Sequence, residues 1–172
     1  MEYSHEIEPW RDLYVMLGTS SAALMGLLFV ATSLHLDEIV NNPIFRMRAR
    51  RNSIYLIFTL VEAALILTPQ PDNYLAIGLL AVNSLGILFP LSNFYNIYRY
   101  KHFTSRGGFS IYRAATFVVA FLIGIAGSVS MIAGWKFGLH LVTLSYLTLL
   151  VSVSLNAWLI MLGVGETQKG AS

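Results

Sequence analysis

The chain has 172 residues, of which 56% are hydrophobic and only 12% are charged, and its formal net charge is +2. Because soluble domains average about 25% charged residues, this composition favours a protein that is solvated mainly by lipid. The chain contains no cysteine, which excludes disulfides, thiolate nucleophiles and thiolate-bound metal centres.

Five apolar segments are long enough, or nearly long enough, to cross a bilayer as helices. A hydrocarbon core of about 30 Å requires about 20 apolar residues in a helix. We expect the spans at about 13–36, 53–68, 74–94, 111–134 and 139–162, the second being the shortest. The backbone in lipid must satisfy its own hydrogen bonds. The sequence therefore predicts an all-α polytopic membrane protein, with residues 1–172 forming a single bundle of five transmembrane helices.

The first span carries small residues at intervals of four, namely Gly18, Ala22 and Gly26. The fourth span repeats this pattern with Ala120, Gly124 and Ser128. Small side chains let a second helix backbone approach closely, which is how helices associate in lipid. We expect both stripes to pack helices, either within one five-helix subunit or between the subunits of a homo-oligomer.

The stretch WRDLYVMLGTSSAALMGLLFVATSLHLDEI, from Trp10 to Ile39, resembles the opening of small uncharacterised bacterial integral membrane proteins. The resemblance implies a multi-pass protein of the bacterial inner (plasma) membrane, and it carries over no mechanism and no functional residue. Aromatic residues near the outer ends of the spans, such as Trp10, Tyr14 and Trp135, are expected to form an interfacial belt.

The second span contains a carboxylic acid, Glu62, near the middle of the apolar segment from Asn52 to Pro69. An acidic residue at a helix centre costs about 2.5–3.5 kcal/mol on insertion scales, so a partner, a proton or water must offset this cost. The short turn TPQPDN makes the second and third spans an antiparallel hairpin. Counting along both helices from this turn places Asn83 at nearly the same depth as Glu62.

Two interpretations of Glu62 are open. No Lys or Arg lies in the core of any span, so no ion pair is available within one subunit. A protonated Glu62 that is hydrogen-bonded to Asn83 would be a packing element, because desolvation disfavours the charged carboxylate. Otherwise, Glu62 would line a hydrated path for cations or protons.

The fifth span carries polar residues on one helix face, at Ser145, Thr148, Ser152 and Asn156. Serine and threonine can donate to the backbone carbonyl four residues earlier, so this face is compatible with packing as well as with a hydrated path. Asn156 cannot satisfy its amide fully in this way and requires a partner from another helix.

The distribution of basic residues predicts the orientation in the membrane. Most of them follow the first or the third span, at Arg46, Arg48, Arg50, Arg51, Arg99, Lys101, Arg106 and Arg113. We therefore expect the N-terminus outside and the C-terminus in the cytoplasm. These basic residues are also expected to contact anionic lipid head groups, whereas nucleic acid is not an expected partner.

The sequence shows no Walker loop, dinucleotide fingerprint, nucleophile elbow or HExxH motif, and no pair of facing histidines for haem. We therefore expect no enzymatic activity, no cofactor and no metal site. Two functions remain. The first is an ion-conducting or permeation protein, assembled as a homo-oligomer, whose path is lined by Glu62, Asn83 and the polar face of the fifth span. The alternative is a non-conducting regulatory or binding subunit that contacts another membrane protein.

Overall fold

The structure is a computed structural model that describes residues 3–36, 41, 43–99 and 108–169. Five helices make up most of this part of the chain: α1 (Tyr3–Leu34), α3 (Pro43–Leu67), α4 (Asp72–Arg99), α5 (Gly108–Ile132) and α6 (Gly138–Lys169). The described ranges contain no strand, and the predicted all-α class is confirmed.

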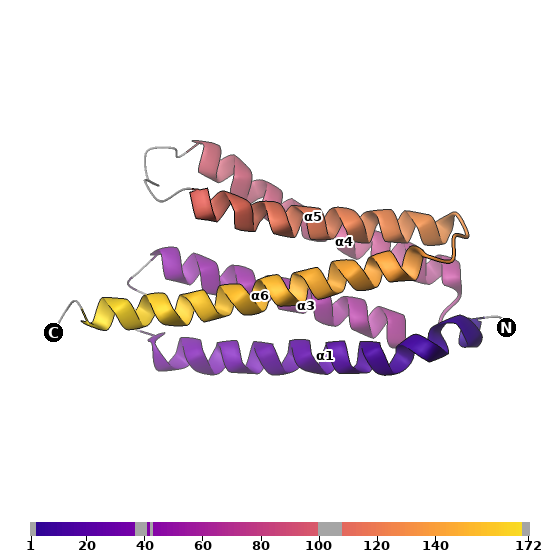
Figure 1. Cartoon of the computed structure of the whole chain (residues 1–172), viewed down its shortest axis with the longest axis horizontal. Coiled ribbons are helices and arrows are strands. Elements are labelled where there is room, and N and C mark those ends of the chain that lie inside the picture. Colours follow the sequence, from indigo (N-terminus) through magenta and orange to yellow (C-terminus); the bar gives the residue numbers. More distant parts are fainter. Residues whose placement is uncertain (1–2, 37–40, 42, 100–107, 170–172) are drawn as a thin grey trace.

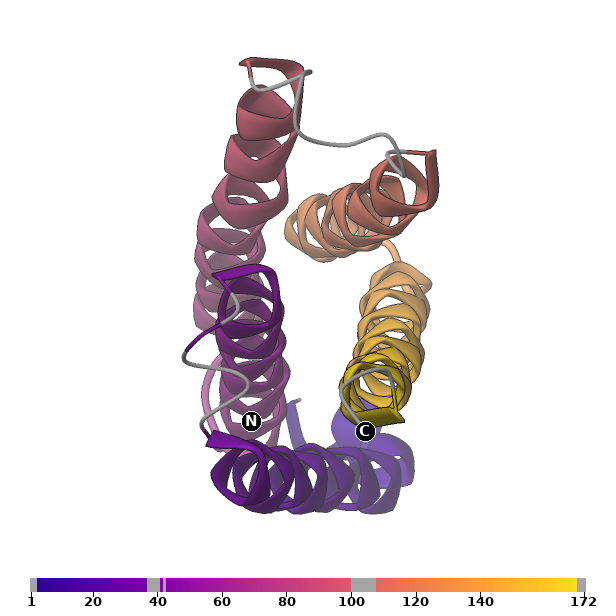
Figure 2. The same ribbon diagram turned by 90° about the vertical axis from the view of Figure 1, so that its left-hand side faces the viewer.

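Successive helices run in opposite directions along one bundle, so the two chain termini lie at opposite ends (Figure 1). Seen from one end, α3 and α4 form one side of the bundle, α5 and α6 form the other side, and α1 lies across one edge (Figure 2). Helix α3 contacts α1, α4 and α6, so it links the two sides of the bundle. The α3–α4 and α5–α6 turns lie at the same end, which we call the turn end.

Four helices are long and apolar enough to cross a membrane. Within the described residues, the stretches that meet this requirement are Glu8–Leu34, Asp72–Ser92, Ala114–Ile132 and Gly138–Trp158. Helix α3 is not among them, because it begins with an arginine-rich segment and carries Glu62 in its short apolar part. The second predicted span is therefore a helix of the bundle, and its passage across the membrane stays a prediction.

The arginine-rich segment before the second predicted span is helical and is not a loop. Helix α3 begins at Pro43, well before residue 53. Proline is favourable in the first turn of a helix, and arginine, methionine and alanine are good helix formers, so the helix extends beyond its apolar part. Arg46 and Arg50 are exposed, and Arg51 is half-buried.

The remaining basic residues of the predicted lipid-contacting set are only partly described. Arg99 is the last residue of α4, and Arg113 lies in the first turns of α5. Lys101 and Arg106 lie outside the described residues, and the side chains of Arg48, Arg99 and Arg113 are not described. The contact with anionic lipid therefore stays a prediction.

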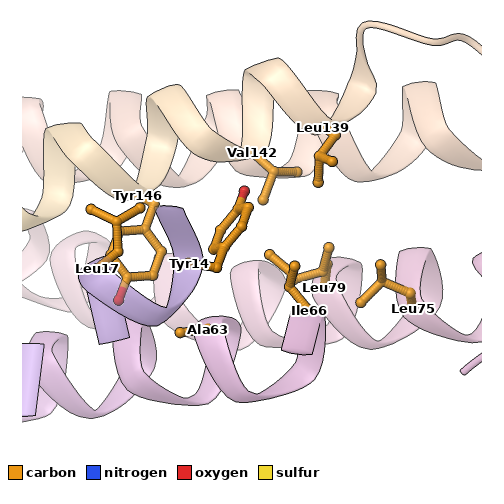
Figure 3. Packing of buried hydrophobic residues seen from close by; sticks show 9 residues of the cluster. All are labelled: Tyr14, Leu17, Ala63, Ile66, Leu75, Leu79, Leu139, Val142 and Tyr146. Atoms are coloured by element: carbon orange, nitrogen blue, oxygen red, sulfur yellow. The ribbon is translucent and has the colours of Figure 1, made fainter. Parts of the chain in front are cut away.

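Two hydrophobic clusters fill the interior. The turn-end cluster, part of which is shown in Figure 3, consists of Tyr14, Leu17, Ala63, Ile66, Leu75, Leu79, Leu139, Val142 and Tyr146. The aromatic cluster lies further from the turn end and consists of Leu28, Tyr55, Leu56, Phe117, Ala120, Phe121, Leu149 and Val153. In it, Tyr55 of α3 stacks on Phe117 of α5, with ring centroids 4.1 Å apart. The turn-end cluster takes residues from α1, α3, α4 and α6, and the aromatic cluster takes residues from α1, α3, α5 and α6. Together the two clusters connect all five helices.

Candidate functional site

Glu62 points into the bundle from α3 and is fully buried. Along α3 it follows Leu56 of the aromatic cluster and precedes Ile66 of the turn-end cluster, so it lies between the two. Thr59, one turn earlier on the same helix face, is also fully buried. Neither oxygen of the Glu62 carboxyl group has a hydrogen-bond partner among the described residues.

Asn83 of α4 is fully buried beside Glu62. Its amide lies close enough to the carboxyl group to interact with it, but no atom pair reaches hydrogen-bonding geometry. Asn83 Nδ2 donates to the carbonyl oxygen of Leu79 at 2.9 Å, which fixes the orientation of the amide because a carbonyl oxygen can only accept. Asn83 Oδ1 has no partner among the described residues.

Helix α5 meets this site with a glycine. A Cβ atom built on Gly124 would collide with Asn83 Oδ1 and would lie 2.9 Å from Ser145 Oγ. Ser145 of α6 is itself buried and donates its hydroxyl hydrogen to the carbonyl oxygen of Ala120 at 2.7 Å. The absence of a side chain at Gly124 therefore lets α4 and α6 bring polar groups against the backbone of α5.

The small-residue stripe of α5 lies in this contact. Ala120 and Ser128 are fully buried and Gly124 is buried.

The small-residue stripe of α1 is packed differently. A Cβ on Gly18 would lie 3.2 Å from Ala63 Cβ, so the backbone of α1 approaches α3 closely there. Ala22 and Gly26 are exposed, and a Cβ on Gly26 would meet nothing within 4 Å. Packing within one subunit therefore accounts for Gly18 alone on this helix.

Two tyrosines link α1 to α6 next to Glu62. Tyr146 and Ser21 join their hydroxyl groups at 2.9 Å, and Tyr14 and Thr143 join theirs at 2.7 Å. Both tyrosine side chains are fully buried, and their rings pack edge to face in the turn-end cluster (Figure 3). The Tyr146 hydroxyl also lies near Thr59 and the Glu62 carboxyl.

These four residues were not among the predicted site residues. Tyr14 was expected in the interfacial belt, and this expectation is wrong, because Tyr14 lies inside the bundle. Thr143 lies off the predicted polar face of the fifth span, which consists of Ser145, Thr148, Ser152 and Asn156. A usable signal was present on α1, where Tyr14 and Ser21 are seven residues apart and therefore share one helix face.

The rest of the predicted path lies further along α6. Thr148 and Ser152 are half-buried, and the Thr148 hydroxyl donates to the carbonyl oxygen of Leu144 at 2.7 Å within its own helix. Asn156 is buried in the middle part of α6. The structure thus brings Asn83 next to Glu62, and it brings Ser145 close to Asn83 at Gly124. The other three residues of the predicted path lie further along α6.

Asn52, which was also not among the predicted site residues, is buried in α3 on the far side of the aromatic cluster. Neither atom of its amide group has a hydrogen-bond partner among the described residues. A buried amide in an arginine-rich helix start gives no periodic signal, which is why the sequence pattern did not identify it.

A comparison of the chain with known protein families, with curated proteins and with solved structures found no match. The resemblance of Trp10 to Ile39 to small bacterial membrane proteins therefore stays a prediction.

The chemistry of the site must be inferred from its own residues. Among the described residues, no group of three or more His, Asp or Glu side chains is placed to hold a metal ion. A single carboxyl group without a basic partner can hold a proton or one monovalent cation.

Proposed function

We propose that the protein is an ion-permeation protein of the bacterial inner membrane, in which Glu62 binds the proton or small cation that crosses. One observation carries this proposal. The carboxyl group of Glu62 is fully buried at the centre of the bundle and lacks a hydrogen-bond partner among the described residues. Such a group is costly in lipid, and ionisable residues inside membrane proteins typically mark ion or proton pathways.

The burial of Glu62, Asn83 and Ser145 favours a path through the bundle of each subunit over one along an axis between subunits. The site is closed toward the turn end by Ile66, Leu79 and Val142, and on the other side by the aromatic cluster. In this proposal the ion therefore exchanges with water only when one of these clusters opens. Five membrane spans, with the N-terminus outside, and assembly as a homo-oligomer are parts of the same proposal.

Flux measurements in liposomes test this function. Wild-type protein should pass protons or small monovalent cations above the level of protein-free liposomes. Glu62→Gln should reduce this flux to background, because the amide keeps the shape of a protonated acid but cannot ionise. Glu8→Gln is the matched control, since Glu8 is an exposed carboxylate on α1, and it should leave the flux unchanged.

A second function, a non-conducting regulatory or binding subunit, is favoured by a different observation. Ala22 and Gly26 leave a smooth exposed surface on α1, where another membrane helix can approach. Wild-type protein that passes neither protons, Na⁺ nor K⁺, at acidic or neutral pH, would contradict the permeation function and leave this second one.

A further inference from the structure

The carboxyl group of Glu62 has few hydrogen-bond donors around it. A carboxylate offers about four lone-pair positions to donors. The Asn83 amide has two hydrogens, and one of them goes to the carbonyl oxygen of Leu79. At most one amide hydrogen therefore remains for Glu62, and it does not reach hydrogen-bonding geometry.

The neighbouring hydroxyl groups direct their hydrogens elsewhere. Thr59 donates to the carbonyl oxygen of Leu56 at 2.9 Å, and Ser145 donates to the carbonyl oxygen of Ala120 at 2.7 Å. A hydroxyl oxygen that has used its single hydrogen keeps two lone pairs as acceptors. The Tyr146 hydroxyl, which is bonded to Ser21, adds another oxygen near the carboxyl group. The site is therefore rich in oxygen acceptors and poor in donors.

The charge of the site is also uncompensated. Among the described residues, the titratable groups that face Glu62 from the other helices are the tyrosines Tyr14 of α1 and Tyr146 of α6, and neither is basic. A buried carboxylate without a counter-charge is costly. One monovalent cation would neutralise it, whereas a divalent cation would leave a buried positive charge. Oxygen ligands of the carboxylate, amide and hydroxyl types suit hard cations.

We propose that Glu62, with the side-chain oxygens of Thr59, Tyr146 and Asn83 around it and that of Ser145 close to Asn83, binds a dehydrated alkali cation of the size of Na⁺ in exchange for a proton. A small cation is favoured because Glu62, Thr59, Tyr146 and Asn83 are fully buried and Ser145 is nearly so, and close-packed interiors contain few voids larger than a water molecule. This inference rests on the proposed role of Glu62 in permeation, and it names the ion that the residue binds.

Thermal unfolding of the purified protein in detergent tests this binding. At alkaline pH, where protons compete least, NaCl should raise the melting temperature above its value in choline chloride of the same concentration. The shift should saturate with Na⁺ concentration, because a ligand that binds only the folded state stabilises it by mass action. KCl should have a smaller effect, and lowering the pH should weaken the effect of Na⁺.

Three variants separate the site from general salt effects. Glu62→Gln should abolish the Na⁺-specific shift. Thr59→Val, which removes one oxygen and keeps the side-chain volume, should weaken the apparent affinity for Na⁺ by about tenfold. Thr19→Val should leave the affinity unchanged, because Thr19 is exposed on α1 and its hydroxyl donates only to Val15 of its own helix.

The results distinguish this inference from the proposed function. Equal melting temperatures of the wild-type protein in NaCl, KCl and choline chloride at alkaline pH would overturn the cation site. If Glu62→Gln then still abolished a proton flux in liposomes, the permeation function would stand with the proton as its ion. A saturable Na⁺ shift in a protein without any flux would support the cation site and contradict permeation.

Discussion

At the scale of single residues, Gly124 shows how the site depends on a missing side chain. Two effects of adding a methyl group there oppose each other. Replacing glycine by alanine within a helix stabilises it by about 0.5–1 kcal/mol, because glycine loses more backbone entropy on folding. Overpacking a filled interior costs about 1–3 kcal/mol. A Cβ on Gly124 would collide with Asn83 Oδ1, which belongs to a side chain held by its bond to Leu79, so the overpacking cost should dominate.

Gly124→Ala should therefore lower the free energy of unfolding by about 1–2 kcal/mol and disturb Asn83, as measured by thermal or denaturant unfolding in detergent. Gly78→Ala on α4 is the matched control. A Cβ there would meet only Leu65 Cδ1 and Cδ2, at 3.6 and 3.7 Å, which is an ordinary contact. This control should be neutral or slightly stabilising. Equal effects of the two substitutions would mean that Asn83 moves freely and that Gly124 does not position it.

At the scale of elements, the apolar pattern predicted where each helix lies, but not where each helix ends. Hydrophobicity marks only the part of a helix that contacts lipid or core, and Arg46 and Arg50 continue α3 into a polar environment without interrupting it. The depth count from the α3–α4 turn placed Asn83 next to Glu62 because two antiparallel helices rise equally from a short turn. The sequence pattern did not predict the two hydroxyl pairs between α1 and α6, which are Tyr14 with Thr143 and Ser21 with Tyr146. Periodicity shows which residues share a helix face, but it does not show which other helix covers that face.

Helix α3 is the element whose passage through the membrane decides the orientation of the chain. If α3 crosses, its two ends lie on opposite sides of the membrane. Arg50→Cys should then be protected from an impermeant thiol reagent in intact cells, whereas Asp72→Cys and Lys136→Cys should react. The native chain has no cysteine, so the background labelling is clean. Equal labelling of Arg50→Cys and Asp72→Cys would show that α3 does not cross, and would leave the four apolar helices as the only spans.

At the scale of the whole molecule, α1 differs from the other helices in how little of it is enclosed. It lies across one edge of the bundle, and it exposes large apolar side chains such as Leu27, Phe29 and Val30 together with Ala22 and Gly26. Apolar side chains can face lipid without a partner. Small residues on the same face, however, additionally allow the backbone of a second subunit to approach closely.

Bulky substitutions along α1 should therefore separate subunit folding from subunit assembly. If the protein assembles as a homo-oligomer through this face of α1, Gly26→Leu should shift the oligomer toward smaller species in native mass spectrometry. The stability of each subunit should change little, because a Cβ on Gly26 would meet nothing within 4 Å in one subunit. Gly18→Leu should instead lower the melting temperature, because a Cβ on Gly18 would lie only 3.2 Å from Ala63 Cβ. Widening this α1–α3 contact would break the packing between α1 and α3 in the turn-end cluster. An unchanged oligomer in Gly26→Leu would mean that lipid covers this face of α1. Assembly through a different helix would then have to be sought on α5, where Leu122 and Val129 are exposed.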